Sequence, residues 1–252
     1  MIVQRWPRWL RAVFLSAIPL VALGMLALGF WQLARLQERR AQNAAIEQRV
    51  AQAPLVLSGV SLPEPPEALD YRPAIVRGTF DPAGEIVWRN QAYQGAPGVH
   101  VITPLRLTGS DVAILVDRGW LPYTQAELEA RRAYPPPAGE QAISGLLRLP
   151  VTRNADFLPA DPTNSPEQPR LDAWFWLDIA QIETQTAYPL LPMLLVQAPD
   201  PEPAALPIRT LVLDLSDGPH LGYALQWFAF AAIAAFGPLI YWWRNRARPA
   251  AG

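Results

Sequence analysis

Two uncharged stretches of 23 residues, one near each end of the chain, constrain the fold more than any other feature. Ala12–Ala34 reads AVFLSAIPLVALGMLALGFWQLA, and Leu221–Trp243 reads LGYALQWFAFAAIAAFGPLIYWW. A helix of this length measures about 35 Å, enough to cross the ~30 Å hydrocarbon core of a bilayer. Both stretches have aromatic residues near their ends, as membrane-spanning helices do. The sequence therefore predicts two transmembrane helices, at 12–34 and 221–243.

Two other interpretations of these stretches are weaker. A helix in the core of a soluble protein needs neither this length nor aromatic ends, and both features occur twice here. A cleaved signal peptide has an apolar core of about 7–15 residues followed by a small-residue cleavage site. Ala12–Ala34 is longer and has no clear A-x-A sequence directly after it. We expect the first helix to be retained as an anchor.

Arginine residues at the two ends predict the topology. They precede the first stretch and follow the second: Arg5, Arg8, Arg11, Arg244, Arg246 and Arg248. Cytoplasmic flanks are rich in basic residues, so residues 1–11 and 244–252 are predicted to be cytoplasmic tails and 35–220 an extracytoplasmic domain. Arg35 and two further arginines oppose this, but a long domain is translocated largely regardless of charge. The short leading segment leaves no room for a mitochondrial presequence, so we expect a multi-pass protein of a bacterial plasma membrane.

Between the helices, alternation of apolar and polar residues predicts short strands. They are expected at 73–80, 85–90, 99–107, 112–120, 141–149, 193–197 and 208–213. Short turns between successive strands favour antiparallel pairing. Residues 35–53 are expected to continue the first helix as a stalk, and helices are expected at 125–134, with Thr124 as N-cap, and after Asp178. The predicted fold class is an α+β membrane protein: two transmembrane helices flank an antiparallel β-rich extracytoplasmic domain, a small barrel or sandwich with one or two helices packed on it.

Composition excludes several kinds of chemistry. The chain has no Cys, and all 21 basic residues are Arg. Thiolate catalysis, Cys-based metal sites, Schiff-base lysines and P-loop lysines are therefore excluded. The net charge of −1 gives no reason to expect nucleic-acid binding. Sequence motifs of hydrolases, dinucleotide-binding enzymes and zinc proteases are absent, so we expect no enzyme, and no catalytic residue is predicted.

Several polar residues of the β-rich segment are interpreted as structural. Acidic residues that could be imagined as carboxylate pairs, such as Asp81 with Glu85, are expected to be solvated at the surface, as are Asp111 and Asp117. Arg118 follows an apolar strand and is expected to pair with a carboxylate. The one histidine in this segment, in the strand at 99–107, is also expected to be structural.

His220 stands directly before the second apolar stretch, at the predicted outer membrane interface. Tyr223 and Trp227 follow at positions that share its helical face. Trp31 and Arg35 stand at the outer end of the first stretch, at the same predicted depth. An imidazole can bind haem iron and an arginine can bind a propionate, although from these residues alone an interfacial histidine beside an aromatic belt is the simpler interpretation. On the same helix, Ala231 and Ala235 predict a small-residue face for close packing.

Five motifs, in order, carry a family resemblance. They are GFWQLARL at 29–36, YRPAIVRGTFDP at 71–82, GVHVITPLRL at 98–107, LVDRGWLP at 115–122 and HLGYALQWF at 220–228. The chain resembles the surfeit-locus family of cytochrome c oxidase assembly proteins from Gly29 to the end of the second apolar stretch. It departs from the family at Gly218-Pro219, where Asn-Asn is usual, and at Asp117, where Asn is usual.

This resemblance implies a non-enzymatic factor that helps to mature subunit I of a haem–copper oxidase. Its partners would be subunit I, other assembly factors and membrane lipid. Bacterial members that this chain resembles are understood to bind haem A, and the histidine that would bind the iron corresponds to His220. Only the role of His220 is carried over from the family. From their expected place at the same depth, we expect Trp31, Tyr223 and Trp227 to pack the macrocycle and Arg35 to bind a propionate. Two alternatives remain open: a scaffold that stabilises oxidase subunits without haem, and an anchored extracytoplasmic enzyme such as a hydrolase.

Overall fold

The structure is a computed structural model, and it describes residues 7–57, 61–153, 160–161, 170–200, 205–211 and 213–246. The chain forms two compact units: a helical unit of residues 1–45 and 214–252, and a β-rich unit of residues 46–213. The terminal Arg5 and Arg248, and most of the Pro-rich stretch at 156–170, lie outside the described residues.

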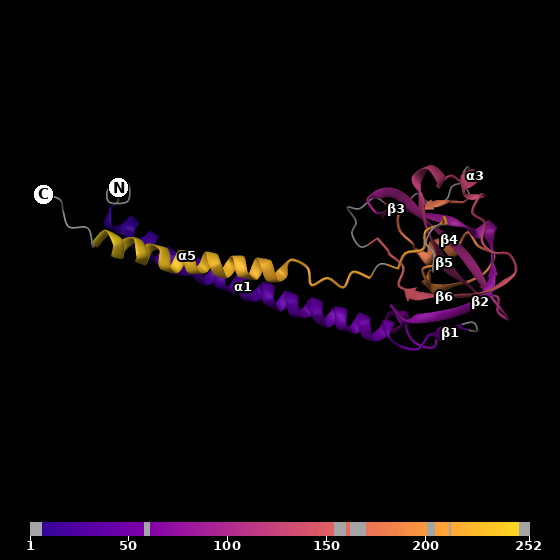
Figure 1. Ribbon diagram of the computed structural model, residues 1–252, viewed down its shortest axis with the longest axis horizontal. Helices are drawn as coiled ribbons and strands as arrows, with labels where there is room; N and C mark the ends of the chain where they lie inside the picture. The colour runs from indigo at the N-terminus through magenta and orange to yellow at the C-terminus, as the bar shows by residue number, and fades with distance from the viewer. Residues whose placement is uncertain are drawn as a thin grey trace. The chain divides into compact units, whose positions relative to one another are not determined.

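Two long helices run antiparallel and side by side in the helical unit (Figure 1). They are α1 (Arg8–Val50), which continues into the β-rich unit, and α5 (His220–Arg246). Each contains a segment long and apolar enough to cross a membrane, Ser16–Val50 and His220–Ile240. In the most apolar window of each, only 11% of the residues are buried. This exposure contradicts the interpretation of the stretches as core helices of a soluble protein.

The contact between α1 and α5 repeats every seven residues. The buried or half-buried positions that recur with this period on α1 are Ala22, Met25, Gly29, Gln32, Leu36, Arg39 and Asn43, and those on α5 are His220, Ala224, Trp227, Ala231 and Ala234. Alternating spacings of three and four place these residues on one stripe, the pattern of left-handed helix pairs. The expected small-residue face is correct for Ala231, which is buried, but wrong for Ala235, which is exposed. The step of four from Trp227 to Ala231 is followed by a step of three to Ala234, so Ala235 lies beside the stripe.

The β-rich unit contains most of the strands that alternation predicted. Its strands are β1 (Leu55–Leu57), β2 (Pro73–Phe80), β3 (Ile86–Tyr93), β4 (Ala96–Leu107), β5 (Ala113–Pro122), β6 (Glu140–Arg148), β7 (Ala173–Trp174) and β8 (Leu190–Gln197). Its short helices are α2 (Pro66–Leu69), η2 (Pro82–Gly84), η3 (Tyr123–Gln125), α3 (Leu128–Arg131) and α4 (Ile179–Glu183). At 208–213 the described residues form only an isolated bridge, between Ile208 and Trp120.

Five strands close into a ring, because β2 pairs with β4 as well as with β6. The order around this small barrel is β2–β6–β8–β5–β4. Its interior holds the largest cluster of buried apolar side chains, which includes Val76, Leu105, Ile114, Leu147 and Leu195. A second cluster, around Ile102, Leu115 and Trp174, lies between the sheet and the segment that contains α4.

The sheet is mixed, so the prediction of an antiparallel β-rich domain is confirmed in part: the domain is β-rich, but not all of its strand pairs are antiparallel. Among the described strands, β1 with β2, β3 with β7 and β5 with β8 pair in parallel. Parallel neighbours need a long connection. The segment between β5 and β8 provides one, because it contains β6, β7 and the three short helices η3, α3 and α4. The short turns of the sequence report only on strands that follow one another directly.

The helix expected at 125–134 is replaced by the short elements η3 and α3. Thr124 lies inside η3 and caps nothing, and the N-cap of α3 is Glu127, without a side-chain hydrogen bond. The carbonyl of Ala126, which would continue a regular helix, instead accepts a hydrogen bond from the side chain of Arg131. The helix expected after Asp178 is confirmed as α4, with Asp178 as its N-cap.

Candidate functional site

His220 is the first residue of α5, and its imidazole is half-buried against α1. Its Nδ1 atom lies 2.9 Å from the side-chain amide oxygen of Gln32. An amide oxygen only accepts hydrogen bonds, so the proton of a neutral imidazole lies on Nδ1 in this arrangement. The lone pair is then on Nε2, which is the atom free to bind a metal.

The Nε2 atom of His220 is open on one side. It has no hydrogen-bond partner in the described part of the chain, and it is not among the buried polar atoms that lack one. The backbone turns beside it at Gly218, which has φ of +67°. A Cβ atom at Gly218 would lie 3.6 Å from Nε2. Glycine therefore permits the turn and keeps the space beside Nε2 free.

A polar clasp, formed by Arg39, Arg40 and Asn43 with the segment 214–217, fixes the approach to His220. Arg39 bonds the carboxylate of Asp214 at 3.1 Å, and Arg40 bonds that of Asp217 at 2.8 Å. Asn43 donates to the carbonyl oxygen of Leu215 at 2.7 Å. The clasp therefore holds the chain that leads into α5 at three successive places along α1.

The pKa of Asp214, in the clasp, lies below its ordinary value. Hydrogen bonds from the hydroxyl and the backbone N–H of Ser216 lower the pKa of Asp214, and the charge of Arg39 lowers it further. The carboxylate is fully solvated, so this shift reports local geometry rather than a large stabilisation.

The predicted aromatic residues lie in separate groups. Arg35 lies over the ring of Trp31, with 5.9 Å between guanidinium and centroid, and also bonds Glu38 at 2.7 Å. Trp227 lies in the contact stripe and packs edge-on against Phe230, with 6.1 Å between centroids. Tyr223 is about half exposed.

These contacts pair His220 with Gln32 and Trp31 with Arg35, but no recorded contact between described residues joins the two pairs. The assignment of Trp31, Arg35, Tyr223 and Trp227 to one site stays a prediction.

A buried ionic network lies in the β-rich unit. One carboxylate oxygen of Glu85 accepts hydrogen bonds from Thr103 and Arg118, both at 2.9 Å. The other lies 3.4 Å from Nε of Arg131, which also bonds both carboxylate oxygens of Asp172. Burial lowers the pKa of Arg118, and the charge of Glu85 opposes that shift. The expected pairing of Arg118 with a carboxylate is confirmed.

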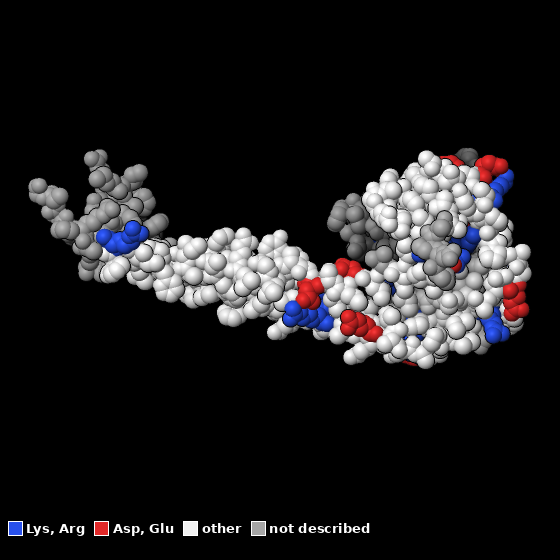
Figure 2. Space-filling model, viewed as in Figure 1, with Lys and Arg blue, Asp and Glu red and all other residues white. Residues whose placement is uncertain are grey.

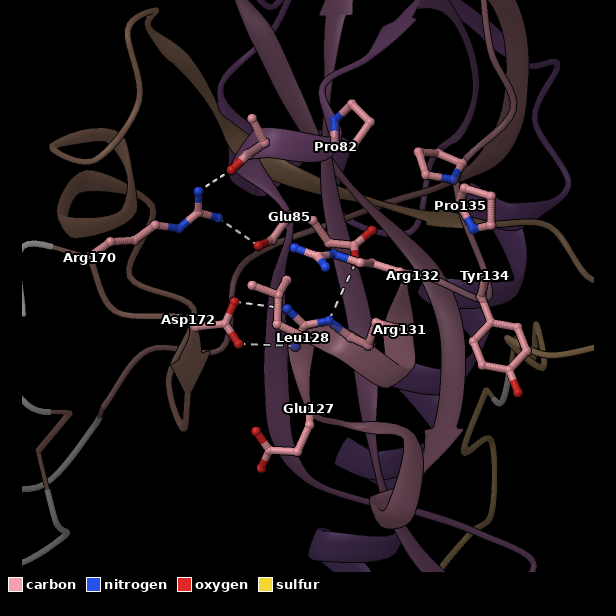
Figure 3. A pocket seen from close by; sticks show the side chains of 12 residues that line it. Pro82, Glu85, Glu127, Leu128, Arg131, Arg132, Tyr134, Pro135, Arg170 and Asp172 are labelled. Carbon is pink, nitrogen blue, oxygen red and sulfur yellow. Dashed lines mark hydrogen bonds and ion pairs between the residues drawn. The ribbon is translucent and has the colours of Figure 1, made fainter.

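A pocket of about 590 Å³ opens beside this network (Figure 3). Its lining combines prolines and Leu128 with the side chains of Arg131, Glu85 and Asp172, which point toward one another in the close-up. Arg170 reaches in from the opposite side and donates to the carbonyl oxygens of Ala83 and Glu85. The arginines therefore find partners within the protein.

The second histidine also has a fixed ring. The Nδ1 atom of His100 lies 2.7 Å from a carboxylate oxygen of Asp117, whose other oxygen accepts from the backbone N–H of Gly119. The ring of Trp88 lies edge-on at 6.0 Å. The expectation of a structural His100 agrees with this pairing. The expectation that Glu85 and Asp117 are solvated at the surface is wrong, because both are buried with cationic or imidazole partners.

Gln32 is the site residue that the sequence analysis missed. Its signal was visible, because it is the one amide side chain in an otherwise apolar or small-residue stretch at 12–34. Its partner could not be found from spacing, since 188 positions separate it from His220. No group of three or more His, Asp or Glu side chains suited to a metal ion occurs within the part of the chain that the structure describes.

Comparison with known proteins tests the resemblance carried by the five motifs. The sequence model of the SURF1 family matches residues 20–232. A SURF1-like protein of Monosiga brevicollis is 29% identical over 214 residues, covering 81% of this chain and 77% of that protein. Surfeit locus protein 1 of Homo sapiens is 29% identical over 225 residues, covering 82% and 70%. The resemblance is confirmed, and the chain belongs to the SURF1 family.

Proposed function

We propose that the protein is a membrane-anchored assembly factor for cytochrome c oxidase. We further propose that it binds haem A through His220 and assists insertion of the haem into subunit I. The proposal combines family membership with one observation that carries it: His220 is held at Nδ1 by Gln32 while Nε2 remains open.

Membrane anchoring is supported by the exposed apolar surface of the helical unit. Leu20, Leu225, Ile233 and Phe236 are each at least 60% exposed. Figure 2 shows a long uncharged stretch along these helices on the face in view. Moving one such side chain out of water contributes about 1.5–3 kcal/mol, so a bilayer is the environment that this surface fits. Membrane lipid is thus a proposed partner.

The residues around His220 fit a haem cargo. A haem supplies four equatorial nitrogen ligands and a redox-active iron, so one protein imidazole is enough to hold it. His220 would supply the axial lone pair, and Trp227 and Tyr223 offer apolar ring surface on the same helix. Trp31 is the further packing residue proposed from α1. Arg35 is proposed for a propionate, in competition with its bond to Glu38.

A single axial ligand suits a protein that must give up its cargo. The chain has no Cys and two histidines, and His220 is the one that stands at the start of the apolar helix α5, whereas His100 lies in β4 of the β-rich unit. Transfer to subunit I then requires one iron–nitrogen bond to be exchanged. A scaffold that stabilises oxidase subunits without haem is the alternative outcome of the test.

The test is the pigment content of the full-length protein, purified in detergent from cells that make haem A. We expect a Soret band, haem A in the extracted pigment, and co-purification of subunit I. Protein that carries subunit I but no haem would support the scaffold instead. Protein that carries neither would contradict the assembly role.

The proposed topology is tested separately with reporter fusions. We propose that both chain ends are cytoplasmic and that the β-rich unit lies outside the cytoplasm of a bacterial cell. A reporter after Gly252 should be active in the cytoplasm, and one inserted at Gly139 should be active outside it. A cytoplasmic reporter at Gly139 would contradict the membrane arrangement.

A further inference from the structure

Gln32 lies at a position where a polar side chain is costly. It belongs to the contact stripe of α1, within a stretch that has no charged residue. An amide taken out of water without a hydrogen bond costs about 1–3 kcal/mol. The side chain of Gln32 meets this cost by facing His220, at 2.9 Å from Nδ1. The two residues therefore form a pair across two helices.

We propose that Gln32 is the positioning residue of the His220 site. Its amide oxygen accepts the Nδ1 proton, which fixes the imidazole in the tautomer that presents its Nε2 lone pair. This inference rests on the proposed function, because it gives a role to the partner of the proposed haem ligand.

General metal chemistry supports the assignment. Histidines that bind metals nearly always donate their other ring N–H to an acceptor, which fixes the tautomer and raises the basicity of the ligand. Loss of such an acceptor typically weakens metal affinity about 10- to 100-fold. The neutral amide of Gln32 is a weaker acceptor than a carboxylate. It orients His220 without strengthening the iron–nitrogen bond as much, which fits a cargo that is passed on.

Contacts on both sides of Gln32 along α1 hold Gln32 and His220 next to each other. On the N-terminal side of Gln32 in α1, Gly29 lies against the ring of Phe228. On its C-terminal side, the clasp joins Asn43 to Leu215. Gln32 lies between these two contacts along α1, so the distance between its amide and His220 is set by packing on both sides. On the side of Gly218, the space next to Nε2 of His220 stays open for a ligand.

One rival arrangement gives the opposite result. If the amide of Gln32 were turned by 180°, its NH₂ group would donate to Nδ1 and the imidazole proton would move to Nε2, where it blocks metal binding. Replacing the amide by a carboxylate distinguishes the two arrangements, because a carboxylate accepts hydrogen bonds but does not donate them. Gln32→Glu should therefore preserve haem binding in our arrangement. In the rival one, the unchanged protein would bind haem weakly and Gln32→Glu would strengthen binding.

The experiment titrates haem A, and protohaem in parallel, into the detergent-purified full chain. It measures the dissociation constant, the Soret spectrum and the reduction potential of the iron. Gln32→Leu should weaken binding about 10- to 100-fold. Gln32→Glu should retain binding and shift the potential to more negative values, because a more basic ligand favours ferric iron. Gln37→Leu, at an exposed position of the same helix, should match the unchanged protein.

The outcomes separate this inference from the proposed function. Gln32→Leu with unchanged affinity, spectrum and potential would overturn the role of Gln32, while loss of haem in His220→Ala would leave the proposed function standing. Loss of binding in Gln32→Glu, with the chain folded, would also overturn it. If Gln32→Leu does not fold, Gln32→Glu alone decides. Retention of haem by His220→Ala would contradict the proposed function itself.

Discussion

Gly29 of α1 lies directly against the ring of Phe228 of α5: a Cβ atom at Gly29 would be 2.4 Å from Cε1 of that ring. The same ring packs edge-on against Phe30, with 5.2 Å between centroids. This contact sets how closely the two helices approach, and therefore whether Gln32 reaches His220.

Gly29→Val should separate the helices at this contact. Overpacking of this kind typically costs about 1–3 kcal/mol, and the bond between Gln32 and His220 should weaken with it. Gly24→Val is the control, because a Cβ atom at Gly24 meets nothing within 4 Å. Thermal unfolding of the full chain in detergent measures the difference. Equal stability of the two variants would contradict the close packing.

Glu85→Ala should strongly destabilise the β-rich unit. It would leave Arg118 and Arg131 buried without one of their carboxylate partners, and breaking a buried ion pair costs about 3–5 kcal/mol. The matched control is Glu129→Ala, which breaks the exposed pair with Arg132 and should cost less than about 1 kcal/mol. Urea unfolding of the full chain followed by tryptophan fluorescence gives both values, and similar losses would contradict the role assigned to the network.

We predict that the free energy of unfolding falls at alkaline pH because of Tyr188. Burial, together with the 2.7 Å hydrogen bond to Asp81, raises the pKa of Tyr188 above its ordinary value. The unfolded chain loses this proton near pH ~10 while the folded chain keeps it, so stability falls as pH rises from there through the higher folded pKa. Tyr188→Phe should remove this part of the fall, whereas Tyr123→Phe, at an exposed tyrosine, should keep it. Parallel pH profiles for Tyr188→Phe and the unchanged protein would contradict the prediction.

Gly218→Val should interfere with haem uptake as well as with folding. A non-glycine residue at positive φ costs about 1–2 kcal/mol, and the new side chain would begin 3.6 Å from Nε2 of His220. Gly139→Val carries a similar backbone strain, at φ of +76°, with nothing nearby. Both variants should lose stability, but only Gly218→Val should bind haem more weakly. Equal haem binding by the two variants would show that Gly218 has no part in access to Nε2.

The sequence predicted elements well wherever the pattern was local. Unbroken apolar stretches located α1 and α5, and alternation located β2, β4 and β6 closely. Prediction from the sequence failed where the partner of a strand or side chain lies far along the chain. The parallel pairing of β5 with β8 and the burial of Glu85 between two arginines both depend on distant contacts.

The candidate site shows the same division. His220 was predicted from its place at the start of an apolar helix and from the family resemblance. Gln32 was overlooked, because a single amide in an apolar helix gives no sign of what it faces. The position of Trp31 was inferred from depth along the helices, and depth does not determine which side of a helix a ring occupies.

The haem content of His220→Ala tests the central claim most directly. The full-length variant is purified from cells that make haem A, beside His100→Gln, whose amide can still donate to Asp117. We predict that His220→Ala loses the Soret band while His100→Gln keeps it, with both chains folded. Full haem content and an unchanged spectrum in His220→Ala would contradict the account, and loss of haem in His100→Gln instead would move the site into the β-rich unit.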